Sequence, residues 1–278
     1  MQFLNSGVMI SHDNIYWGAM TGGVKVAGLK AKQEVMVSYL PLSHVAANVS
    51  DIWGTFLLQG TIIFADKMAL KGTLIETLKE ARPTVFFGVP RVYEKIVEGI
   101  KNKATEAKGM KRTMFQTFTK AALQYHSENG SKIFYHIGRK VFYSKLLAAI
   151  GLDKCRAFYT GAAPIGNETL KYLLGLDVTV RDIYGMSEAP STTAVYKTLK
   201  LGSVGQPIPG CKVRIVNKNH VGHGEVCLWG RNVMMGYLNA KDRTIESIDS
   251  EGWMHSGDVG YTDADDNLFI TGKYTLSV

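Results

Sequence analysis

Cysteine is scarce in this 278-residue chain, and its few copies are widely separated. Cys155, Cys211 and Cys227 form no Cys-x-x-Cys pair, the short spacing that supplies two ligands to a structural zinc site. Their odd number leaves at least one thiol without a disulfide partner. We therefore expect reduced cysteines in the core of a cytoplasmic protein.

The chain also lacks a long apolar run and a secretory leader. No segment is apolar over the roughly 20 residues that a helix needs to cross a bilayer. The first residues, MQFLNSGVMISHDN, contain no basic leader with an apolar core and a small-residue cleavage site. We expect a folded protein that is neither secreted nor membrane-spanning.

Acidic residues are few in one part of the chain. Between residues 95 and 145, eleven Lys or Arg stand against three Glu, an excess of 8 that equals the net charge of the whole chain, +8. Apolar residues recur there every three or four positions, which predicts helices with a break at SENGS (127–131). The ordinary explanation of the charge is a solvated helical face, and contact with an anionic membrane surface is the functional alternative. Nucleic acid is not expected as a partner, because no recognisable binding motif accompanies the charge.

Short apolar runs alternate with helical patterns over the first two thirds of the chain. Strands are predicted in EVMVSYL (34–40), TIIFAD (61–66), TVFFGVP (84–90), KCRAFYTG (154–161) and DVTVRDI (177–183). Helical spacing occurs in VAANVSDIWGTFLLQG (45–60), GTLIETLKEARP (72–83), GNETLKYLLGL (166–176) and the segment from Arg91. This alternation predicts an α/β fold with layered, mostly parallel sheets.

Beyond residue 198 the pattern changes to short strands separated by glycine and proline. Examples are GSVGQPIPGCKVRIVN (202–217), HGEVCLWGRNVMMGYLN (223–239) and NLFITGK (267–273). We predict two parts: an α/β portion over residues 1–197 and a small β-rich subdomain over residues 198–278.

The pentapeptide YGMSE (184–188) follows a predicted strand and combines four useful groups. Tyr184 offers a flat face on which a base can stack, and Gly185 allows close approach of a backbone. Ser187 and Glu188 supply oxygens suited to phosphate and to a hard cation. The alternative is a core tyrosine followed by two residues that cap a turn. The motif alone leaves both interpretations open.

Further short motifs accompany YGMSE in a fixed order. They are PLSHVAANVSDIWG (41–54), VFFGVPRVYEKI (85–96), YTGAAP (159–164), GSVGQPIPG (202–210), GEVCLWGRNVMMGYLN (224–239) and GWMHSGDVGYTDADDNLFITGK (252–273). Their order and spacing closely resemble those of the adenylate-forming acyl-CoA synthetases. The first two resemble the bubblegum-type long-chain branch, and the resemblance covers nearly the whole chain.

The resemblance implies roles for the central motif. In that family the tyrosine matching Tyr184 stacks on adenine, the hydroxyl matching Ser187 contacts the α-phosphate, and the acid matching Glu188 holds Mg²⁺. His44, in PLSH, matches a histidine beside the acyl carboxylate. For His44, a hydrogen-bonded histidine that ends a strand is an equally good explanation.

Other matching positions imply contacts with the nucleotide. The loop of Gly161, Ala162 and Ala163 corresponds to the small residues that line the adenine pocket in relatives. Asp258, in HSGD, matches the aspartate that bridges the ribose hydroxyls. Lys273 stands where relatives have an arginine, so it keeps the positive charge and loses the planar guanidinium.

The neighbouring TDADDN (262–267) is expected to be a hairpin turn. The glycine and the closing glutamate of a calcium loop are missing from it. His255 is expected to be a structural residue in a turn beside Asp258.

The resemblance also implies the reaction, that of an AMP-forming long-chain fatty acid–CoA ligase. Such a site orients a fatty acid carboxylate against the α-phosphate of ATP, while Mg²⁺ neutralises charge and pyrophosphate leaves. The thiol of coenzyme A then attacks the acyl-adenylate. No protein nucleophile is required, because positioning and electrostatics supply the catalysis. The expected cofactors are thus ATP, Mg²⁺ and coenzyme A.

Both ends of the chain depart from the family pattern. MQFLNS (1–6) stands where relatives carry a Ser/Thr/Gly-rich loop that wraps the β- and γ-phosphates. The end, ITGKYTLSV (270–278), does not continue into the usual hinge and mobile lid domain. We expect a truncated form with impaired adenylation.

Two alternatives remain open. In the first, the chain is a catalytically silent nucleotide-binding or regulatory fragment. In the second, the basic stretch 95–145 carries the function by making peripheral contact with the cytoplasmic face of an internal membrane. Nucleotide binding without pyrophosphate release would favour the first. Salt-sensitive binding to vesicles would favour the second.

Overall fold

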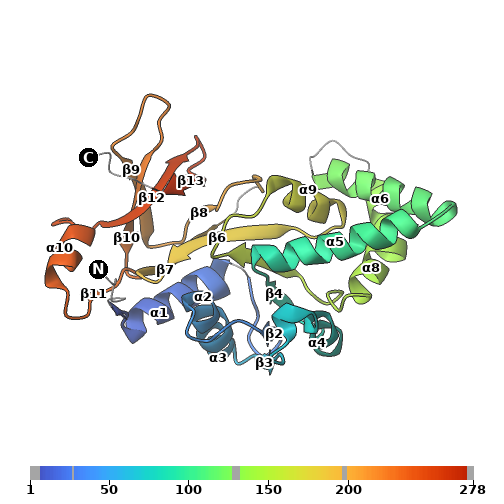
Figure 1. Ribbon diagram of the computed structural model, residues 1–278, viewed down its shortest axis with the longest axis horizontal. Helices are drawn as coiled ribbons and strands as arrows, with labels where there is room; N and C mark the ends of the chain where they lie inside the picture. The colour runs from blue at the N-terminus through green and yellow to red at the C-terminus, as the bar shows by residue number, and fades with distance from the viewer. Residues whose placement is uncertain (1–6, 27, 127–131, 196–198, 274–278) are drawn as a thin grey trace. The chain divides into compact units, whose positions relative to one another are not determined.

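The computed structural model describes residues 7–26, 28–126, 132–195 and 199–273, which Figure 1 shows as ribbons. The chain forms two compact units. Unit 1 consists of residues 1–30, 42–58 and 182–278, and unit 2 consists of residues 31–41 and 59–181. Each unit therefore combines segments that are far apart in the sequence.

This division differs from a single boundary near residue 198. The last passage between the units lies between Arg181 and Asp182, inside strand β6 (Val180–Met186). The β-rich segment after residue 198 belongs to unit 1 together with the start of the chain. In that unit β1 (Val8–Met9) pairs antiparallel with β11 (Gly236–Tyr237). The sequence pattern could not reveal this pairing, because both strands are only two residues long.

Unit 2 contains the parallel strand pairs. β2 (Val35–Ser38) pairs with β3 (Thr61–Phe64), and β4 (Val85–Phe87) pairs with β5 (Ala157–Gly161). All four strands match predicted apolar runs, which are rich in the β-branched and aromatic residues that suit a pleated surface. Helices connect them, as parallel pairing requires.

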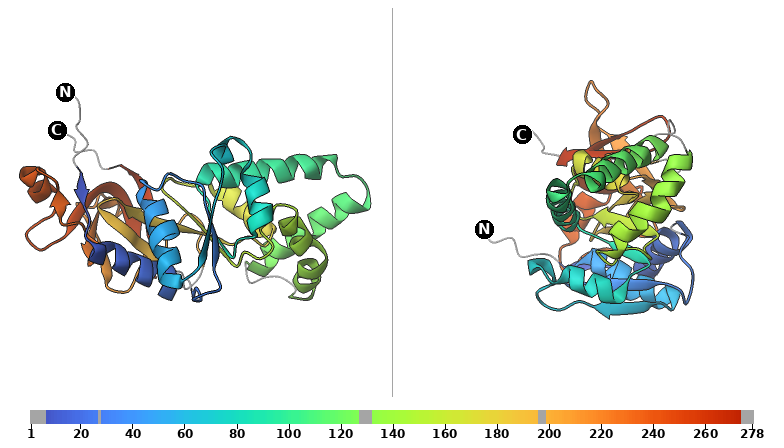
Figure 2. Two further views of the ribbon diagram at one scale, coloured as in Figure 1. Left: turned by 90° about the horizontal axis from the view of Figure 1, so that it is seen from below. Right: turned by 90° about the vertical axis from the view of Figure 1, so that its right-hand side faces the viewer.

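Unit 2 is mainly helical, and Figure 2 shows its helices from two further sides. They are η3 (Ala69–Lys71), α4 (Leu74–Ala81), α5 (Pro90–Glu106), α6 (Met110–His126), α7 (Lys132–Gly138), η4 (Arg139–Tyr143), α8 (Ser144–Ala148) and α9 (Asn167–Gly175). Pro90 opens α5 at the helix position where a missing N–H costs nothing.

The basic stretch forms helices as predicted, but it breaks at an additional point. α5 ends before Ala107, and Gly109 has a positive φ of 56° just before α6 begins. A glycine adopts this backbone conformation without steric penalty, so the chain reverses there. The predicted break at 127–131 lies outside the described residues.

An aromatic cluster joins α6, α7 and η4. Phe118, Ala122, Tyr135 and Tyr143 are buried together. The rings of Tyr125 and Tyr135 stack with centroids 3.7 Å apart, and the Tyr143 hydroxyl donates to the carbonyl oxygen of Phe118 at 2.5 Å. Burial raises the pKa of Tyr143 to about 12, which keeps this phenol protonated as a donor.

A buried carboxylate holds the strands of unit 2 together. Glu34, directly before β2, is 1% exposed. It accepts a hydrogen bond from the Thr84 hydroxyl at 2.6 Å and pairs with the guanidinium of Arg156, the residue before β5. Because a buried charge without a partner is costly, this pair specifies the arrangement of β2, β4 and β5.

Unit 1 is built from antiparallel strands. A four-stranded sheet has the order β13 (Leu268–Lys273), β12 (Met254–Thr262), β10 (Gly224–Gly230) and β9 (Cys211–Val216). β7 (Ala189–Val195) pairs antiparallel with β6 and with β8 (Gln206–Pro207). Short strands separated by glycine and proline were predicted for this region, and the four-stranded sheet confirms them.

Apolar side chains from several of these strands form the core of unit 1. Val226, Leu228, Met254 and Leu268 are almost fully buried and pack with Ala189 of β7. The helices of this unit are α1 (His12–Gly18), η1 (Ala19–Val26), α2 (Val45–Ala47), η2 (Asn48–Gly54), α3 (Thr55–Leu58) and α10 (Lys241–Ser247).

The architecture confirms the α/β class, with its parallel pairs in unit 2 and its antiparallel pairs in unit 1. Cys211 and Cys227 are buried as expected, whereas Cys155 is half-buried, and all three are free. Among the helices that the structure describes, none combines the length and the apolar composition that a bilayer crossing requires.

Candidate functional site

The YGMSE motif lies in a β-hairpin. Tyr184, Gly185 and Met186 belong to β6, which corrects the expectation that the strand ends before the tyrosine. Only Ser187 and Glu188 form the turn that leads into β7. The strand continues because residues of β7 pair with it, including Thr193 opposite Tyr184.

Gly185 is required by the hairpin itself. A Cβ atom at this position would lie 2.6 Å from the backbone nitrogen of Ser191 and 3.1 Å from the carbonyl oxygen of Ala189. These are backbone atoms, which cannot move aside as the end of a flexible side chain can. The close approach predicted for this glycine therefore involves the neighbouring strand of the same chain.

The Tyr184 ring is fixed by a hydrogen bond to a buried aspartate. The Tyr184 hydroxyl donates to Oδ2 of Asp258 at 2.7 Å, and Nζ of Lys273 lies 2.5 Å from Oδ1 of the same carboxylate. The Asp258 side chain is 10% exposed, whereas that of Lys273 is 75% exposed. The backbone N–H of Asp258 donates to the Ser256 hydroxyl at 3.0 Å. Three predicted site residues from β6, β12 and β13 are thus in direct contact.

The Tyr184 hydroxyl stays protonated in this contact. Burial, followed by the negative charge of Asp258, raises the pKa of Tyr184 well above its ordinary value. The phenol therefore remains a hydrogen-bond donor throughout the physiological range. Asp258 accepts two bonds at opposite oxygens, and a carboxylate has further lone pairs for ligand hydroxyls.

Glu188 is held by a tyrosine that the sequence did not single out. The Tyr237 hydroxyl donates to Oε1 of Glu188 at 2.7 Å, and the backbone N–H of Met234 donates to the Glu188 carbonyl oxygen at 2.8 Å. Burial and the negative charge of Glu188 raise the pKa of Tyr237. Carboxylate oxygens are the ligands that Mg²⁺ prefers, so Glu188 fits its predicted role chemically.

Ser187 is exposed at the tip of the same hairpin turn. Its hydroxyl is therefore accessible to solvent and to a ligand. The predicted contact with an α-phosphate stays a prediction.

His44 caps a short helix. Its Nδ1 accepts the backbone N–H of Ala46 at 3.2 Å, at the start of α2, and the residue is exposed. His44 is thus hydrogen-bonded, but it begins a helix and does not end a strand, because β2 ends at Ser38. The alternative role beside an acyl carboxylate stays a prediction.

The small-residue loop lies in unit 2, whereas the other predicted site residues lie in unit 1. Gly161 is the buried last residue of β5, and Ala162 and Ala163 follow it with exposed side chains. Ala162 has a positive φ of 69°, a conformation that is uncommon for a residue with a side chain. Its role as the wall of an adenine pocket stays a prediction.

His255 lies in β12, which corrects its expected place in a turn. Its Nδ1 is 2.9 Å from Oε2 of Glu225 and 3.6 Å from Sγ of Cys227, the residue that faces it on β10. Burial raises the pKa of Cys227 to about 11, and Arg214 faces the same thiol from β9. These side chains form a polar connection between β9, β10 and β12.

TDADDN is the hairpin turn that was predicted. Oδ1 of Asp263 accepts the backbone N–H groups of Asp265 and Asn267, each at 2.9 Å. Lys200 adds ion pairs at 2.7 Å to Asp263 and 2.6 Å to Asp265. The turn joins β12 to β13 and sets the register of the pairs next to it, from Thr262 opposite Leu268 to Gly260 opposite Ile270.

Sequence reasoning missed the residues that support the site. Tyr237 lay within the GYLN string, but its spacing of 49 residues from Glu188 carries no signal of contact. Ser256 could have been found, because residues two apart on a strand share a face and Asp258 was already a candidate. Its hydroxyl also donates to the carbonyl oxygen of Val226 at 2.7 Å.

Comparison with known proteins defines the class. Residues 6–238 match the family of AMP-binding enzymes, and the chain belongs to this family. The match includes Tyr184, Ser187 and Glu188, whereas Asp258 and Lys273 lie beyond it.

The relatives are bubblegum-type ligases, which confirms the resemblance seen in the sequence. The chain is 45% identical over 276 residues to long-chain-fatty-acid–CoA ligase ACSBG2 of Xenopus laevis, with 96% of this chain and 37% of the relative covered. It is 42% identical over 277 residues to ACSBG1 of Mus musculus, with 96% and 38% covered. The chain thus spans well under half the length of these curated relatives.

Solved structures share the fold. A malonyl-CoA ligase in a ternary product complex with methylmalonyl-CoA and AMP matches with a TM-score of 0.70 and 23% identity, covering 96% of this chain and 50% of that one. O-succinylbenzoate coenzyme A synthetase of Bacillus subtilis in complex with AMP matches with a TM-score of 0.69 and 18% identity, covering 96% and 46%. These likenesses confirm the predicted fold class.

Proposed function

We propose that this chain is the nucleotide- and acyl-binding portion of an ATP-dependent, AMP-forming long-chain-fatty-acid–CoA ligase. The observation that carries the proposal is the buried Asp258 carboxylate, held by Tyr184 and Lys273, in a chain of the AMP-binding enzyme family. The names of relatives at 42–45% identity support the choice of a long-chain fatty acid as substrate.

The side chains of unit 1 divide the work of holding ATP. Tyr184 presents a ring whose orientation is set by its hydrogen bond to Asp258, so a stacked base meets a fixed surface. Asp258 accepts hydrogen bonds from the ribose hydroxyls, and Ser187 donates to the α-phosphate. Glu188, oriented by Tyr237, would hold the Mg²⁺ that neutralises phosphate charge when it is bound.

The reaction then proceeds by positioning. A carboxylate oxygen of the fatty acid attacks the α-phosphorus, and pyrophosphate leaves to give the acyl-adenylate. The sulfur of coenzyme A attacks the acyl carbon, and AMP leaves. Hydrogen-bond donors fixed before the reaction stabilise the charge that develops on phosphate oxygens.

We also propose a cytoplasmic location with peripheral contact to an internal membrane through residues 95–145. Support comes from apolar side chains exposed beside basic ones on α6, α7 and η4: Met110, Ile133, Phe134, Ile137 and Val141. Such a surface binds anionic bilayers through apolar burial and charge together. Co-sedimentation with anionic vesicles at low and high salt tests this contact.

The proposed reaction is tested by measuring nucleotide binding and pyrophosphate release separately on the 278-residue chain. We expect AMP binding by calorimetry that weakens about tenfold in Tyr184→Ala, because base stacking contributes about 1–3 kcal/mol. The exposed Tyr16, also in unit 1, provides the matched control Tyr16→Ala, which should leave AMP affinity unchanged.

The outcomes separate the alternatives. Pyrophosphate release that depends on palmitate supports the full proposal. AMP binding without release identifies a silent nucleotide-binding fragment, which contradicts the catalytic part. Absence of both, or equal loss in the control, overturns the proposal.

A further inference from the structure

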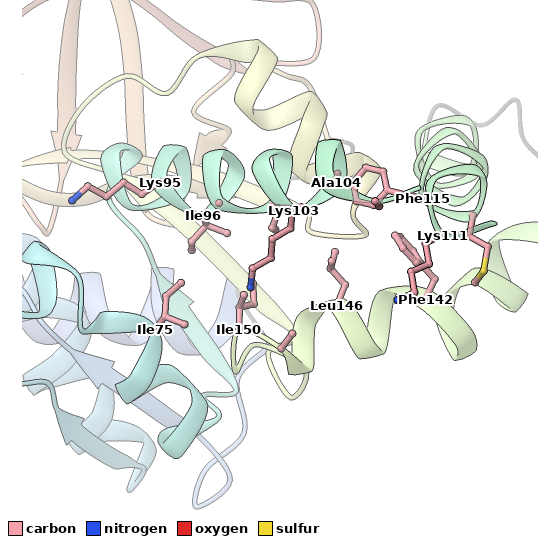
Figure 3. Close-up of a pocket in the computed structure, with 15 residues that line it drawn as sticks. Ile75, Lys95, Ile96, Lys103, Ala104, Lys111, Phe115, Phe142, Leu146 and Ile150 are labelled. Carbon is pink, nitrogen blue, oxygen red and sulfur yellow. The ribbon is translucent and has the colours of Figure 1, made fainter. Parts of the chain in front are cut away.

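A pocket of 530 Å³ lies within unit 2. This volume falls in the range of about 300–1,000 Å³ that is typical of small-molecule sites. None of the residues predicted to bind nucleotide lines it. Figure 3 shows α5 above the pocket, α8 below it, and side chains of α6 and η4 at one end.

The wall of the pocket is apolar. Ile96 and Ala104 contribute from α5, Phe115 from α6, Leu146 from α8 and Ile75 from α4. These side chains come from four helices within one compact unit, so the folded unit forms the wall without help from unit 1. An apolar wall favours a hydrocarbon ligand, since removing apolar surface from water drives association.

The charged groups of the pocket are all lysines. Lys95, Lys103 and Lys111 line it, and no acidic residue does so in the part of the chain that the structure describes. Nζ of Lys95 donates to the carbonyl oxygen of Leu70 at 3.0 Å. Figure 3 shows Lys103 reaching from α5 across the pocket toward Ile150, and Lys111 near Phe142.

Lys103 and Lys111 have no acidic partner among the described residues. They also lie in the stretch where basic residues exceed acidic ones by 8. Two unpaired ammonium groups beside an apolar wall complement a ligand with a negative end and a hydrocarbon body. Lysines that merely extend over apolar surface into water would match no particular ligand.

We propose that this pocket binds the carboxylate form of a long-chain fatty acid. The hydrocarbon chain lies against the wall between α5 and α8. The carboxylate is bound by a lysine at one end of the pocket, Lys103 or Lys111, because Figure 3 shows Leu146 between these two side chains. The inference goes beyond the proposed ligase chemistry, because it rests on residues of unit 2 that take no part in holding ATP.

Direct binding of a fluorescent fatty acid to the 278-residue chain tests the inference. The probe is cis-parinaric acid, used below its critical micelle concentration, and its own fluorescence is excited and measured. Palmitate and the uncharged hexadecanol serve as competitors. Lys103→Glu/Lys111→Glu should weaken probe binding about tenfold, because each reversal replaces attraction by repulsion. Lys108→Glu is the matched control, since Lys108 is exposed in the same segment but does not line the pocket.

A second variant fills the pocket and leaves its charge unchanged. Ala104→Trp places a large ring on the α5 wall, and we expect it to remove most probe binding. Far-ultraviolet circular dichroism verifies that each variant keeps its helices. If Ala104→Trp fails to fold, the lysine pair alone decides, because exposed lysines tolerate reversal.

The inference is overturned by unchanged probe affinity in Lys103→Glu/Lys111→Glu, by an equal loss of affinity in Lys108→Glu, or by hexadecanol competing as well as palmitate. Loss of binding on adding AMP or in Tyr184→Ala would place the acyl chain at the nucleotide site, and it would also overturn the proposal. A change of oligomeric state in Ala104→Trp would show that a second copy occupies the pocket instead.

A chain that binds parinaric acid in the lysine-dependent manner but fails to bind AMP supports the pocket and counts against the proposed ligase. A chain that adsorbs to vesicles equally well with and without Lys103→Glu/Lys111→Glu, and that does not bind the dissolved probe, uses its basic surface to contact a bilayer. This result refutes the fatty acid site.

Discussion

Replacing Tyr184 by phenylalanine removes one hydroxyl and leaves the aromatic ring in place. In the folded chain that hydroxyl donates to Oδ2 of Asp258 at 2.7 Å, and the Asp258 side chain is 10% exposed. The substitution therefore leaves a buried carboxylate with one hydrogen bond fewer. We expect unit 1 to lose stability while the stacking surface for a base remains.

The magnitude follows from burial. A hydrogen bond to a buried charged group contributes about 1.5–3 kcal/mol, so Tyr184→Phe should cost about 2 kcal/mol. Lys273 lies closer to the same carboxylate, 2.5 Å from Oδ1, but its side chain is 75% exposed. Exposed ion pairs contribute about 0.2–1 kcal/mol, so Lys273→Ala should cost less than half as much despite the shorter distance.

Tryptophan fluorescence during urea unfolding reports on the relevant unit. The four tryptophans, Trp17, Trp53, Trp229 and Trp253, all lie in unit 1. The control is Tyr261→Phe on β12, because the Tyr261 hydroxyl makes no hydrogen bond within the described chain, although its ring stacks on Phe269. We expect no change of the urea midpoint in this control.

The order of the three losses decides whether the reasoning holds. Tyr184→Phe should be the most destabilising, Lys273→Ala intermediate and Tyr261→Phe neutral. If Lys273→Ala costs more than Tyr184→Phe, burial does not determine the strength of these contacts and the argument is refuted. AMP affinity should change less than threefold in Tyr184→Phe, because the stacking ring is retained.

Three other substitutions test the fold. Arg156→Ala removes the guanidinium that pairs with the buried Glu34 carboxylate and should destabilise unit 2 by about 3 kcal/mol. We expect early loss of helical circular dichroism with unchanged tryptophan fluorescence, and equal stability of Arg156→Ala and Arg156→Lys would contradict this. Gly185→Ala should lower the free energy of unfolding by at least about 2 kcal/mol in thermal unfolding, because the new Cβ would lie 2.6 Å from the backbone of β7. Gly272→Ala is the control and should be near neutral, because the space around Gly272 is open. Burial raises the pKa of Asp182 to about 7, so the contribution of this carboxyl to stability is fully present below pH 4 and is lost as the pH rises through 7. Asp182→Asn should make stability depend less on pH over this range. Parallel pH profiles of the variant and the parent chain would count against this prediction.

The α/β pattern of unit 2 was predictable because its signals are local. Strands such as β2 and β5 are continuous apolar runs, and α4 and α5 show helical spacing that ends or begins at a proline. Such features depend on neighbours within a few residues. The reversal at Gly109 was missed, since a glycine within a helical pattern does not by itself mark a turn.

The extent of β6 was not predictable from the same kind of signal. Gly185 lowers the strand propensity at the point where the motif begins, which favours ending the strand there. The strand continues because β7 folds back on it and fills the hydrogen-bonding positions. Pairing with β7 thus overrides the low strand propensity of Gly185. The close packing of the hairpin requires glycine at this position.

Contacts within the candidate site depend on the register between strands. β12 and β13 pair directly from Thr262 opposite Leu268 to Gly260 opposite Ile270, and beyond that point Val259 faces Gly272. One extra residue on β13 therefore forms a bulge. Residues that face each other across an antiparallel pair share one side of the sheet.

Without the bulge, Asp258 would face Gly272, and the ammonium group of Lys273 would point to the opposite side of the sheet. The bulge shifts the register by one residue and brings Nζ within 2.5 Å of the carboxylate. The Lys273 ammonium group thus reaches Asp258 because of the β-bulge. The residue preferences of the ITGK string do not predict this bulge. Bulges of this kind redirect a side chain toward a site, so the charge pairing at Asp258 is a property of the sheet register as much as of the residues that form it.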